Sequence, residues 1–257
     1  MDNEWLVYHK RKLERADEIG SEVYISTTEK SYDTICEFLD AMRDFLPERY
    51  PSLFVRTTPG LDNIVTGEKV DFTSHPLKEN PMVMAAKSVQ DDLVIMIEED
   101  GQYYSKAGVI MLTDFWRLKD KLGITMSAIH TSGDDLKYNE RNNYFIQTDD
   151  DIAWSSAIGA EDSAEIGWCT ADVAKTAEQL YFRSERQSLR KLPRTGAVVF
   201  IIHTYFLPIP KLCVEPFVSR SLAKYNDVFM PYLEEKAREQ EEIMGHTLDK
   251  KPVSYPY

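Results

Sequence analysis

Residues 182–208 have the sequence FRSERQSLRKLPRTGAVVFIIHTYFLP, and this stretch decides the fold prediction. Its second half is the most continuous apolar, β-forming run in the chain, which predicts a strand over residues 196–206 after a strand over residues 180–183. Its first half carries five cations within twelve residues: Arg183, Arg186, Arg190, Lys191 and Arg194. Because the chain as a whole is acidic, these cations need an anionic counterpart, either Glu185 or the phosphate or carboxylate groups of a ligand. We therefore expect a binding site in this segment.

The composition is that of an ordinary globular protein with a strong negative charge. The chain has 257 residues, 43% of them hydrophobic, and a formal net charge of -13. This charge argues against nucleic acid and anionic membranes as partners, since both are bound by clustered cations. Cys36, Cys169 and Cys213 are far apart, so a disulfide framework, a zinc site and an iron–sulfur cluster are not expected. The first residues contain no apolar targeting segment, which predicts a cytoplasmic, reduced protein.

The pattern of apolar residues predicts an α+β fold, with an antiparallel sheet of about five strands flanked by helices. Asp100-Gly101 between two apolar runs indicates a hairpin. The strands are expected over residues 92–97, 103–112, 144–147, 180–183 and 196–206. Helices are expected from Thr28 or Ser31 to a point before Pro47, over residues 82–90 after a start at Asn80-Pro81, over residues 115–122 up to a stop at Gly123, and over residues 219–244. Turns are expected at Pro59-Gly60, Thr66-Gly67 and His75-Pro76. We expect one domain over residues 1–245 and a frayed tail over residues 246–257.

Histidines and cysteines are the candidate ligands, because motifs for nucleotide binding, zinc hydrolysis and kinase chemistry are absent. His130 closes an apolar segment and has two interpretations, an axial ligand to the iron of a porphyrin or a buried histidine satisfied by a carbonyl. His203 shares one face of its predicted strand with Ile201 and Tyr205, where an ordinary sheet histidine is the simpler interpretation. Cys169 and Cys213 are either thiolate ligands or, more simply, buried inert thiols.

The cationic segment also has two interpretations. Strand alternation places Arg183 and Glu185 on one face and Arg186 on the other, so at least one of these charges faces the interior. Buried charges mark functional sites, which favours a role in binding or catalysis. The alternative is a solvated surface whose ion pairs contribute about 0–1 kcal/mol each.

Residues 183–193, followed by residues 195–200, form a motif that resembles the hallmark of the haem-dependent oxidative N-demethylase family. The similarity is to fungal members of the family and covers most of the chain. In those members the connection that corresponds to residues 135–140 is longer. Further matching segments are Trp5-Leu6 with residues 11–15, and residues 89–93, 108–116, 121–123, 129–134 and 141–147.

The resemblance implies a PAS-like fold in which a five-stranded antiparallel sheet and helices enclose haem b. It implies oxidative N-demethylation of a small, dimethylamine-like amine with O2, using electrons from NAD(P)H that pass through a separate reductase with flavin and iron–sulfur centres. On the matching positions, His130 would be the proximal iron ligand. Catalytic roles beside it would fall to Glu185, Arg186 and Tyr205, and cofactor contacts to Arg183, Arg190 and His203.

Other functions fit the same residues. A PAS-like module without catalysis would be a haem sensor, or a degenerate scaffold that holds no haem. A third alternative is a tailoring monooxygenase that oxidises a larger metabolite. The haem content of the purified protein separates the scaffold from the other functions, and formaldehyde release separates an N-demethylase from a sensor.

Overall fold

The computed structural model describes residues 4–19, 25–27, 29–73, 77–112, 117–129, 140–156, 159–163 and 176–213. These residues belong to two compact units. The first comprises the described parts of Met1–Asn143, Ile152–Trp154 and Glu185–Thr204, and the second those of Tyr144–Asp151, Ser155–Ser184 and Tyr205–Tyr257. Several predictions fall outside the described residues: His130, Cys169, the helix over residues 219–244 and the tail over residues 246–257.

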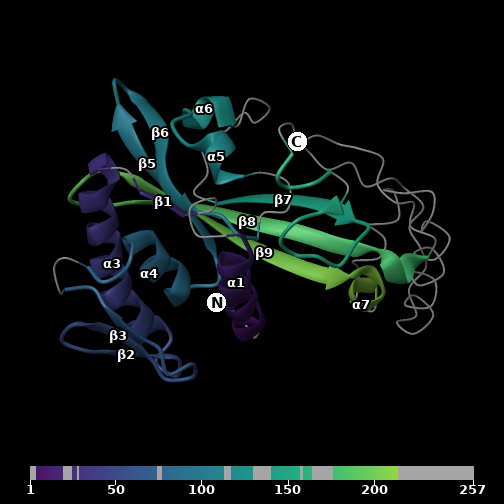
Figure 1. Ribbon diagram of the computed structural model, residues 1–257, viewed down its shortest axis with the longest axis horizontal. Coiled ribbons are helices and arrows are strands. Elements are labelled where there is room, and N and C mark those ends of the chain that lie inside the picture. The colour runs from purple at the N-terminus through teal and green to yellow at the C-terminus, as the bar shows by residue number, and fades with distance from the viewer. Residues whose placement is uncertain are drawn as a thin grey trace, which may run out of the picture. The chain divides into compact units, whose positions relative to one another are not determined.

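The fold combines helices with a mainly antiparallel sheet, which confirms the predicted α+β class (Figure 1). The helices are α1 Trp5–Ile19, α3 Glu29–Arg49, α4 Pro81–Ser88, α5 Leu118–Lys121, α6 Met126–Ile129 and α7 Ile209–Cys213, with a 3-10 turn η2 at Ala177–Gln179. The strands are β1 Ile25–Thr27, β2 Phe54–Arg56, β3 Gly60–Asn63, β4 Lys69–Asp71, β5 Asp92–Glu99, β6 Gln102–Val109, β7 Glu140–Gln147, β8 Tyr181–Lys191 and β9 Val198–Pro208. Among the described helices, none combines the length and the apolar character that crossing a membrane requires.

The main sheet has the strand order β1-β6-β5-β9-β8-β7. Its five long strands, β5 to β9, are the five that the sequence predicts, and the three-residue edge strand β1 is an addition. The expected hairpin joins β5 to β6, with positive φ angles of 52° at Asp100 and 77° at Gly101. These left-handed conformations are the ones a tight two-residue hairpin turn requires, which explains the Asp-Gly pair.

Strand β8 is longer than predicted, since it continues past Arg183 through the cationic segment to Lys191. The predicted alternation is confirmed, because Arg183, Glu185 and Gln187 are buried while Arg186 between them is exposed. The charged side chains of β8 therefore occupy fixed faces of a strand, whereas Arg194 lies in the turn that follows. The turn comes later, where the Leu192 N–H donates to the Ala197 carbonyl at 2.7 Å.

The sheet in the first unit is covered on two faces, and the strands alternate between them. On β5, Leu93 and Ile95 pack into a core with α1, α3 and α4, whereas Val94 and Met96 pack into a second core with α5 and α6. Figure 1 shows α3 and α4 on one side of β5 and β6, and α5 and α6 on the other. We call these sides of the sheet the α3 face and the α6 face.

Two local predictions about the N-terminal part are wrong. Helix α3 does not end before Pro47 but contains it, because a proline near the end of a helix removes a single backbone donor. Beyond the proline, Tyr50 N still donates to the Leu46 carbonyl at 2.8 Å. The segment predicted as turns forms a small sheet, β2-β3-β4. In it, a Cβ on Gly60 would lie 2.0 Å from the Val70 carbonyl oxygen, so the close pairing of β3 with β4 requires glycine there.

Helix α4 begins as predicted at Asn80-Pro81. The Asn80 side-chain oxygen accepts a hydrogen bond from Met82 N at 2.9 Å and caps the helix, and Pro81 occupies the first turn, where its missing N–H has no consequence. Gly123 follows α5 with a φ of 79°, the left-handed stop that was expected.

Candidate functional site

An apolar cavity of about 390 Å3 lies on the α6 face of the sheet. Strands β5, β6, β8 and β9 supply its floor and helix α6 supplies a wall. We call it the α6 cavity, and its lining residues are Met96, Gly101, Gln102, Tyr103, Met126, Ser127, Leu189 and Val198. Because α6 ends at Ile129, the next residue in the chain is His130, the candidate iron ligand, which lies outside the described residues.

Glu185 lies on the same face of β8 as the α6 cavity. Side chains two residues apart on a strand point to one side, so Glu185 and Gln187 share the orientation of Leu189, which lines the cavity. The Glu185 carboxylate is 1% exposed, and its Oε2 accepts a hydrogen bond from Gln187 Nε2 at 3.2 Å. This places a buried carboxylate of fixed orientation in the strand that floors the cavity.

Arg186 and Arg190 alternate with these residues and therefore lie on the α3 face of β8. Arg186 is exposed, while Arg190 lines a smaller cavity that helix α3 covers. His203 on β9 shares the α3 face with Val199 and Ile201. Its Nδ1 lies 2.8 Å from Oδ1 of Asp91, so the partner of this buried histidine is a carboxylate. The structure thus separates Arg190 and His203 from the face that carries Glu185.

Arg183 and Tyr205 belong to the second compact unit. Arg183 is fully buried, with its guanidinium 6.0 Å from the centroid of the Phe206 ring, and Phe206 stacks on Tyr181 at 4.9 Å. Tyr205 is half-buried. A cation over an aromatic face is stabilised by the ring quadrupole, so Arg183 is held by this stack.

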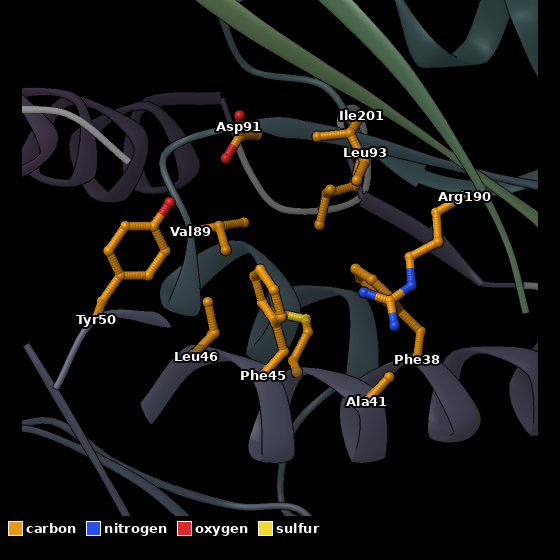
Figure 2. Close-up of a pocket in the computed structure, with 11 residues that line it drawn as sticks. Phe38, Ala41, Phe45, Leu46, Tyr50, Val89, Asp91, Leu93, Arg190 and Ile201 are labelled. Atoms are coloured by element: carbon orange, nitrogen blue, oxygen red, sulfur yellow. The ribbon is translucent and has the colours of Figure 1, made fainter. Parts of the chain in front are cut away.

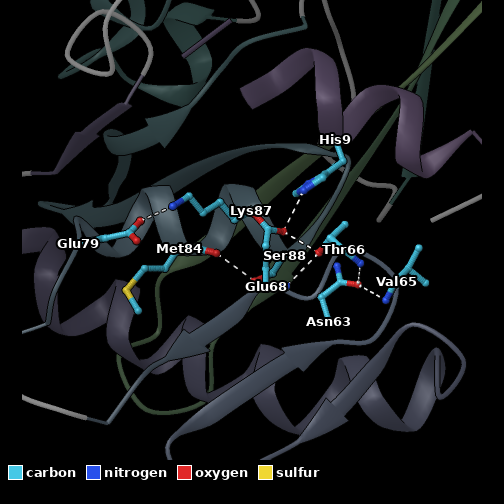
Figure 3. Close-up of polar contacts among 9 residues, drawn as sticks. All are labelled: His9, Asn63, Val65, Thr66, Glu68, Glu79, Met84, Lys87 and Ser88. Carbon is cyan, nitrogen blue, oxygen red and sulfur yellow. Dashed lines mark hydrogen bonds and ion pairs between the residues drawn. The ribbon is translucent and has the colours of Figure 1, made fainter. Parts of the chain in front are cut away.

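A third cavity, of about 460 Å3, contains polar groups that the sequence did not single out. We call it the α1 cavity, because His9 and Lys12 of α1 line it together with Glu68. His9 is buried, stacks on Trp5 at 5.1 Å, and places Nε2 2.9 Å from Glu68 Oε2 (Figure 3). Glu68 is held in turn by the Thr66 hydroxyl, which donates to its Oε2 at 3.0 Å. One signal in the sequence could have pointed to this cavity: two polar residues, His9 and Lys12, lie three positions apart in an amphipathic helix.

The buried cation of the α1 cavity connects helix α1 to strand β5. Lys12 Nζ donates to the Asp91 carbonyl at 2.5 Å and lies 3.6 Å from Asp92 Oδ1. Burial lowers the pKa of Lys12, although the charges of Asp92 and Asp91 act in the opposite direction. The other oxygen of Asp92, Oδ2, accepts the backbone N–H groups of Met111 and Leu112 at 3.1 and 2.8 Å. One carboxylate therefore joins the lysine of α1 to the chain that leaves β6.

His9 should make the stability of the protein depend on pH. Burial lowers the pKa of His9 below its ordinary value of 6.5, the charge of Lys12 adds to this, and Glu68 opposes it. The unfolded chain therefore takes up this proton more readily than the folded chain, so the stability present above pH 6.5 is lost as the pH falls below it. We expect His9→Phe, which keeps an aromatic ring beside Trp5, to lose less stability between about pH 7.5 and about pH 5.5.

Urea unfolding of both proteins at the two pH values measures this difference. Asp91 does not interfere with this measurement. Burial raises the pKa of Asp91, but the hydrogen bond and charge of His203 outweigh burial and lower it. The stability that Asp91 contributes is therefore lost only when the pH falls below the ordinary carboxyl pKa of 3.8, outside the measured range. Equal losses in the wild type and in His9→Phe would show that His9 titrates alike in the folded and unfolded chains.

Comparison with known proteins adds the decisive observation. The family model described as haem-dependent oxidative N-demethylase, alpha subunit-like, matches residues 1–138 and 134–235 of the chain. The chain belongs to this family. The two matches meet at residues 134–138, where the connection over residues 135–140 begins. No curated protein matches the chain.

The name of this family implies a haem, so we asked whether the α6 cavity fits one. Its volume of about 390 Å3 lies near the lower end of the range of about 300–1,000 Å3 that is typical of ligand pockets. Since a cavity of about 150 Å3 holds one benzene molecule, the described lining encloses only part of a porphyrin. Its walls include Met96, Leu189 and Val198, whose apolar surfaces suit a porphyrin ring. Among the described residues, no group of three or more His, Cys, Asp or Glu is arranged to hold a metal ion, while haem iron takes a single proximal protein ligand in many proteins. The described residues are therefore compatible with one edge of a haem, and the rest of the porphyrin would extend beyond this lining.

Proposed function

We propose that this chain is the haem-binding oxygenase subunit of an oxidative N-demethylase. The family match over most of the chain carries this proposal. The α6 cavity supports it, because it combines an apolar surface with a buried carboxylate on the same strand face and with a helix that leads to a histidine.

The proposed cofactor site is the α6 cavity. Met96, Tyr103 and Leu189 would contact the porphyrin, and His130 would supply the imidazole ligand. When bound, haem supplies an iron centre at which dioxygen is activated. The protein contributes an apolar surrounding that keeps bulk water away from this centre.

The proposed task of Glu185 is to orient the substrate. A small secondary amine is protonated at neutral pH, and a buried carboxylate attracts its N–H groups and fixes the position of its methyl group. Gln187 holds the carboxylate in place through Oε2. Arg186 is exposed on the opposite face, so we assign it no part in this pocket.

The overall reaction defines what the subunit needs from elsewhere. One oxygen atom of O2 enters a methyl C–H bond, the resulting carbinolamine releases formaldehyde and the demethylated amine, and the second oxygen atom leaves as water with two electrons and two protons. The chain has no sequence motif for binding flavin, nicotinamide or an iron–sulfur cluster. We therefore propose a separate reductase protein that delivers electrons from NAD(P)H one at a time.

The full chain, purified and titrated with hemin, tests the proposal. We expect one hemin per chain with a Soret band, and formaldehyde from dimethylamine when a surrogate reductase and NADPH are added. Glu185→Gln should keep the Soret band and lower turnover roughly 10- to 100-fold, the loss expected for a hydrogen bond to a charged group. Ser188→Ala, a change on the opposite face of β8, is the matched control and should not alter turnover.

Two other outcomes would redirect the assignment. Hemin binding without formaldehyde from any small methylamine would favour the haem sensor or the tailoring monooxygenase of a larger metabolite. A protein that takes up no hemin would contradict the proposed cofactor site and leave the degenerate scaffold as the explanation.

A further inference from the structure

A small cavity of about 120 Å3 on the α3 face is lined by two opposite charges (Figure 2). We call it the α3 cavity. The charges are Asp91, just before β5, and Arg190 on β8, and the remaining lining is aromatic or aliphatic: Phe38, Ala41, Met42, Phe45, Leu46, Tyr50, Val89, Leu93 and Ile201. Figure 2 shows the guanidinium of Arg190 reaching toward the cavity near Phe38 and Phe45, with the Asp91 carboxylate at another side.

The guanidinium of Arg190 is placed to bind an anion at the entrance. Its central carbon lies 5.8 Å from the centroid of the Phe45 ring, and both residues are exposed, Phe45 by 45%. The contact with the Phe45 ring holds the planar guanidinium in one orientation. Its N–H donors are not used by the ring, so they can bind an anion. Within the part of the chain that the structure describes, no carboxylate forms an ion pair with Arg190. This includes Asp91 in the same cavity, whose ion pair is with His203.

The carboxylate of Asp91 is placed to bind a cation. His203 engages Oδ1 at 2.8 Å, and Asp91 also lines the cavity, so Oδ2 is the oxygen that a ligand would use. Burial raises the pKa of Asp91, but the hydrogen bond and charge of His203 and the charge of Lys12 outweigh burial and lower it, which keeps the carboxyl ionised at neutral pH. A negative and a positive group thus line one cavity without pairing to each other.

We propose that the α3 cavity binds a small zwitterion of the amino-acid type. The ligand carboxylate would pair with Arg190 in the bidentate geometry that guanidinium favours, and its ammonium group with Asp91 Oδ2. A zwitterion supplies both an anion for Arg190, which has no carboxylate partner among the described residues, and N–H donors for the Asp91 oxygen that His203 does not engage. The apolar lining would take a methyl-sized side chain.

The volume sets the size of the ligand. An apolar cavity of about 150 Å3 holds a benzene molecule, which has six heavy atoms. The α3 cavity is somewhat smaller, at about 120 Å3, and opens at Arg190, so a ligand of roughly six heavy atoms such as L-alanine is expected to fit. L-Phenylalanine, with twice as many heavy atoms, is too large.

This site is separate from the proposed haem pocket. Leu189 lines the α6 cavity and its neighbour Arg190 lines the α3 cavity, so the sheet itself lies between the two. The inference therefore does not rest on the proposed oxygenase function, and each can fail while the other stands.

Isothermal titration of the full chain with L-alanine tests the proposal. We expect saturable binding of L-alanine, and binding of acetate, ethylamine and L-phenylalanine at least about tenfold weaker, the factor that 1.4 kcal/mol represents. Arg190→Met, which keeps an unbranched stem over Phe45, should weaken L-alanine binding by at least the same factor. Lys191→Met is the matched control, since Lys191 is the next residue, is an exposed cation and does not line the cavity.

Each result decides the question. Saturable binding that is lost in Arg190→Met and in Asp91→Asn, and kept in Lys191→Met, would establish a zwitterion site between the two charges. The proposal is overturned if L-alanine gives no saturable heat, if acetate alone binds as tightly, or if Arg190→Met binds like the wild type.

Discussion

Asp92→Ala is expected to lower the free energy of unfolding by about 3–5 kcal/mol, the cost of leaving a buried charge without its partner. Asp92 is 2% exposed and accepts two backbone N–H groups, from Met111 and Leu112, through Oδ2. Its Oδ1 lies 3.6 Å from the ammonium of Lys12, which is also 2% exposed. The substitution would leave two buried donors unsatisfied and weaken the pairing of a buried ammonium. Urea unfolding followed by circular dichroism measures the loss.

A surface pair of the same chemical types provides the control. Lys69 Nζ lies 3.8 Å from Asp62 Oδ2, but the Lys69 side chain is 78% exposed. Exposed pairs contribute about 0–1 kcal/mol, so Asp62→Ala should change the stability by no more than that. Similar losses in Asp92→Ala and Asp62→Ala would show that burial of the Lys12 pair adds nothing to stability.

Much of the main sheet could be predicted because its strands carry strong local signals. Strands β5 and β9 contain continuous apolar runs, and the Asp100-Gly101 turn has a backbone conformation that few other residue pairs adopt. The short strands β3 and β4 lack such signals, since GLDN and KVD contain no run of apolar residues. They form because Gly60 allows a close approach of two backbones, which is a tertiary effect.

The candidate site was predictable only in part, for a related reason. Alternation along β8 correctly separated Glu185 from Arg186, because a strand has a period of two. Alternation does not say which helices cover each face. Only the fold shows that Leu189 lines a cavity beside α6 while Arg190 lines a cavity beside α3. The cationic segment therefore contributes residues to two different cavities.

Pairings between distant parts of the chain could not be predicted at all. His203 reaches Asp91 across 112 positions, and Lys12 reaches the Asp91 carbonyl across 79. The resemblance did mark Asp91 and Asp92 as part of a family segment, but gave neither residue a partner. The structure supplies a reason for both acids: Asp92 joins β5 to α1, and Asp91 joins β5 to β9 beside the α3 cavity.

His130→Ala is expected to abolish the Soret band of the hemin-reconstituted protein. The reason is that the proposed iron ligand would be removed, while the apolar wall formed by Met126 of α6 would remain. Added imidazole should restore the band, since a free ligand can occupy the space that the side chain leaves. Absorption spectra of the ferric protein and of the ferrous–carbonyl form measure both effects.

His203→Gln is the control for this experiment. His203 is also buried, but it lies on the α3 face, where its Nδ1 is 2.8 Å from Asp91. Glutamine keeps a hydrogen-bond donor for Asp91, so the fold should persist and the Soret band should match the wild type. If His203→Gln loses the band and His130→Ala keeps it, the iron ligand lies on the α3 face and the α6 cavity is not the haem pocket. A ferrous–carbonyl spectrum of the thiolate type would instead assign the ligand to a cysteine.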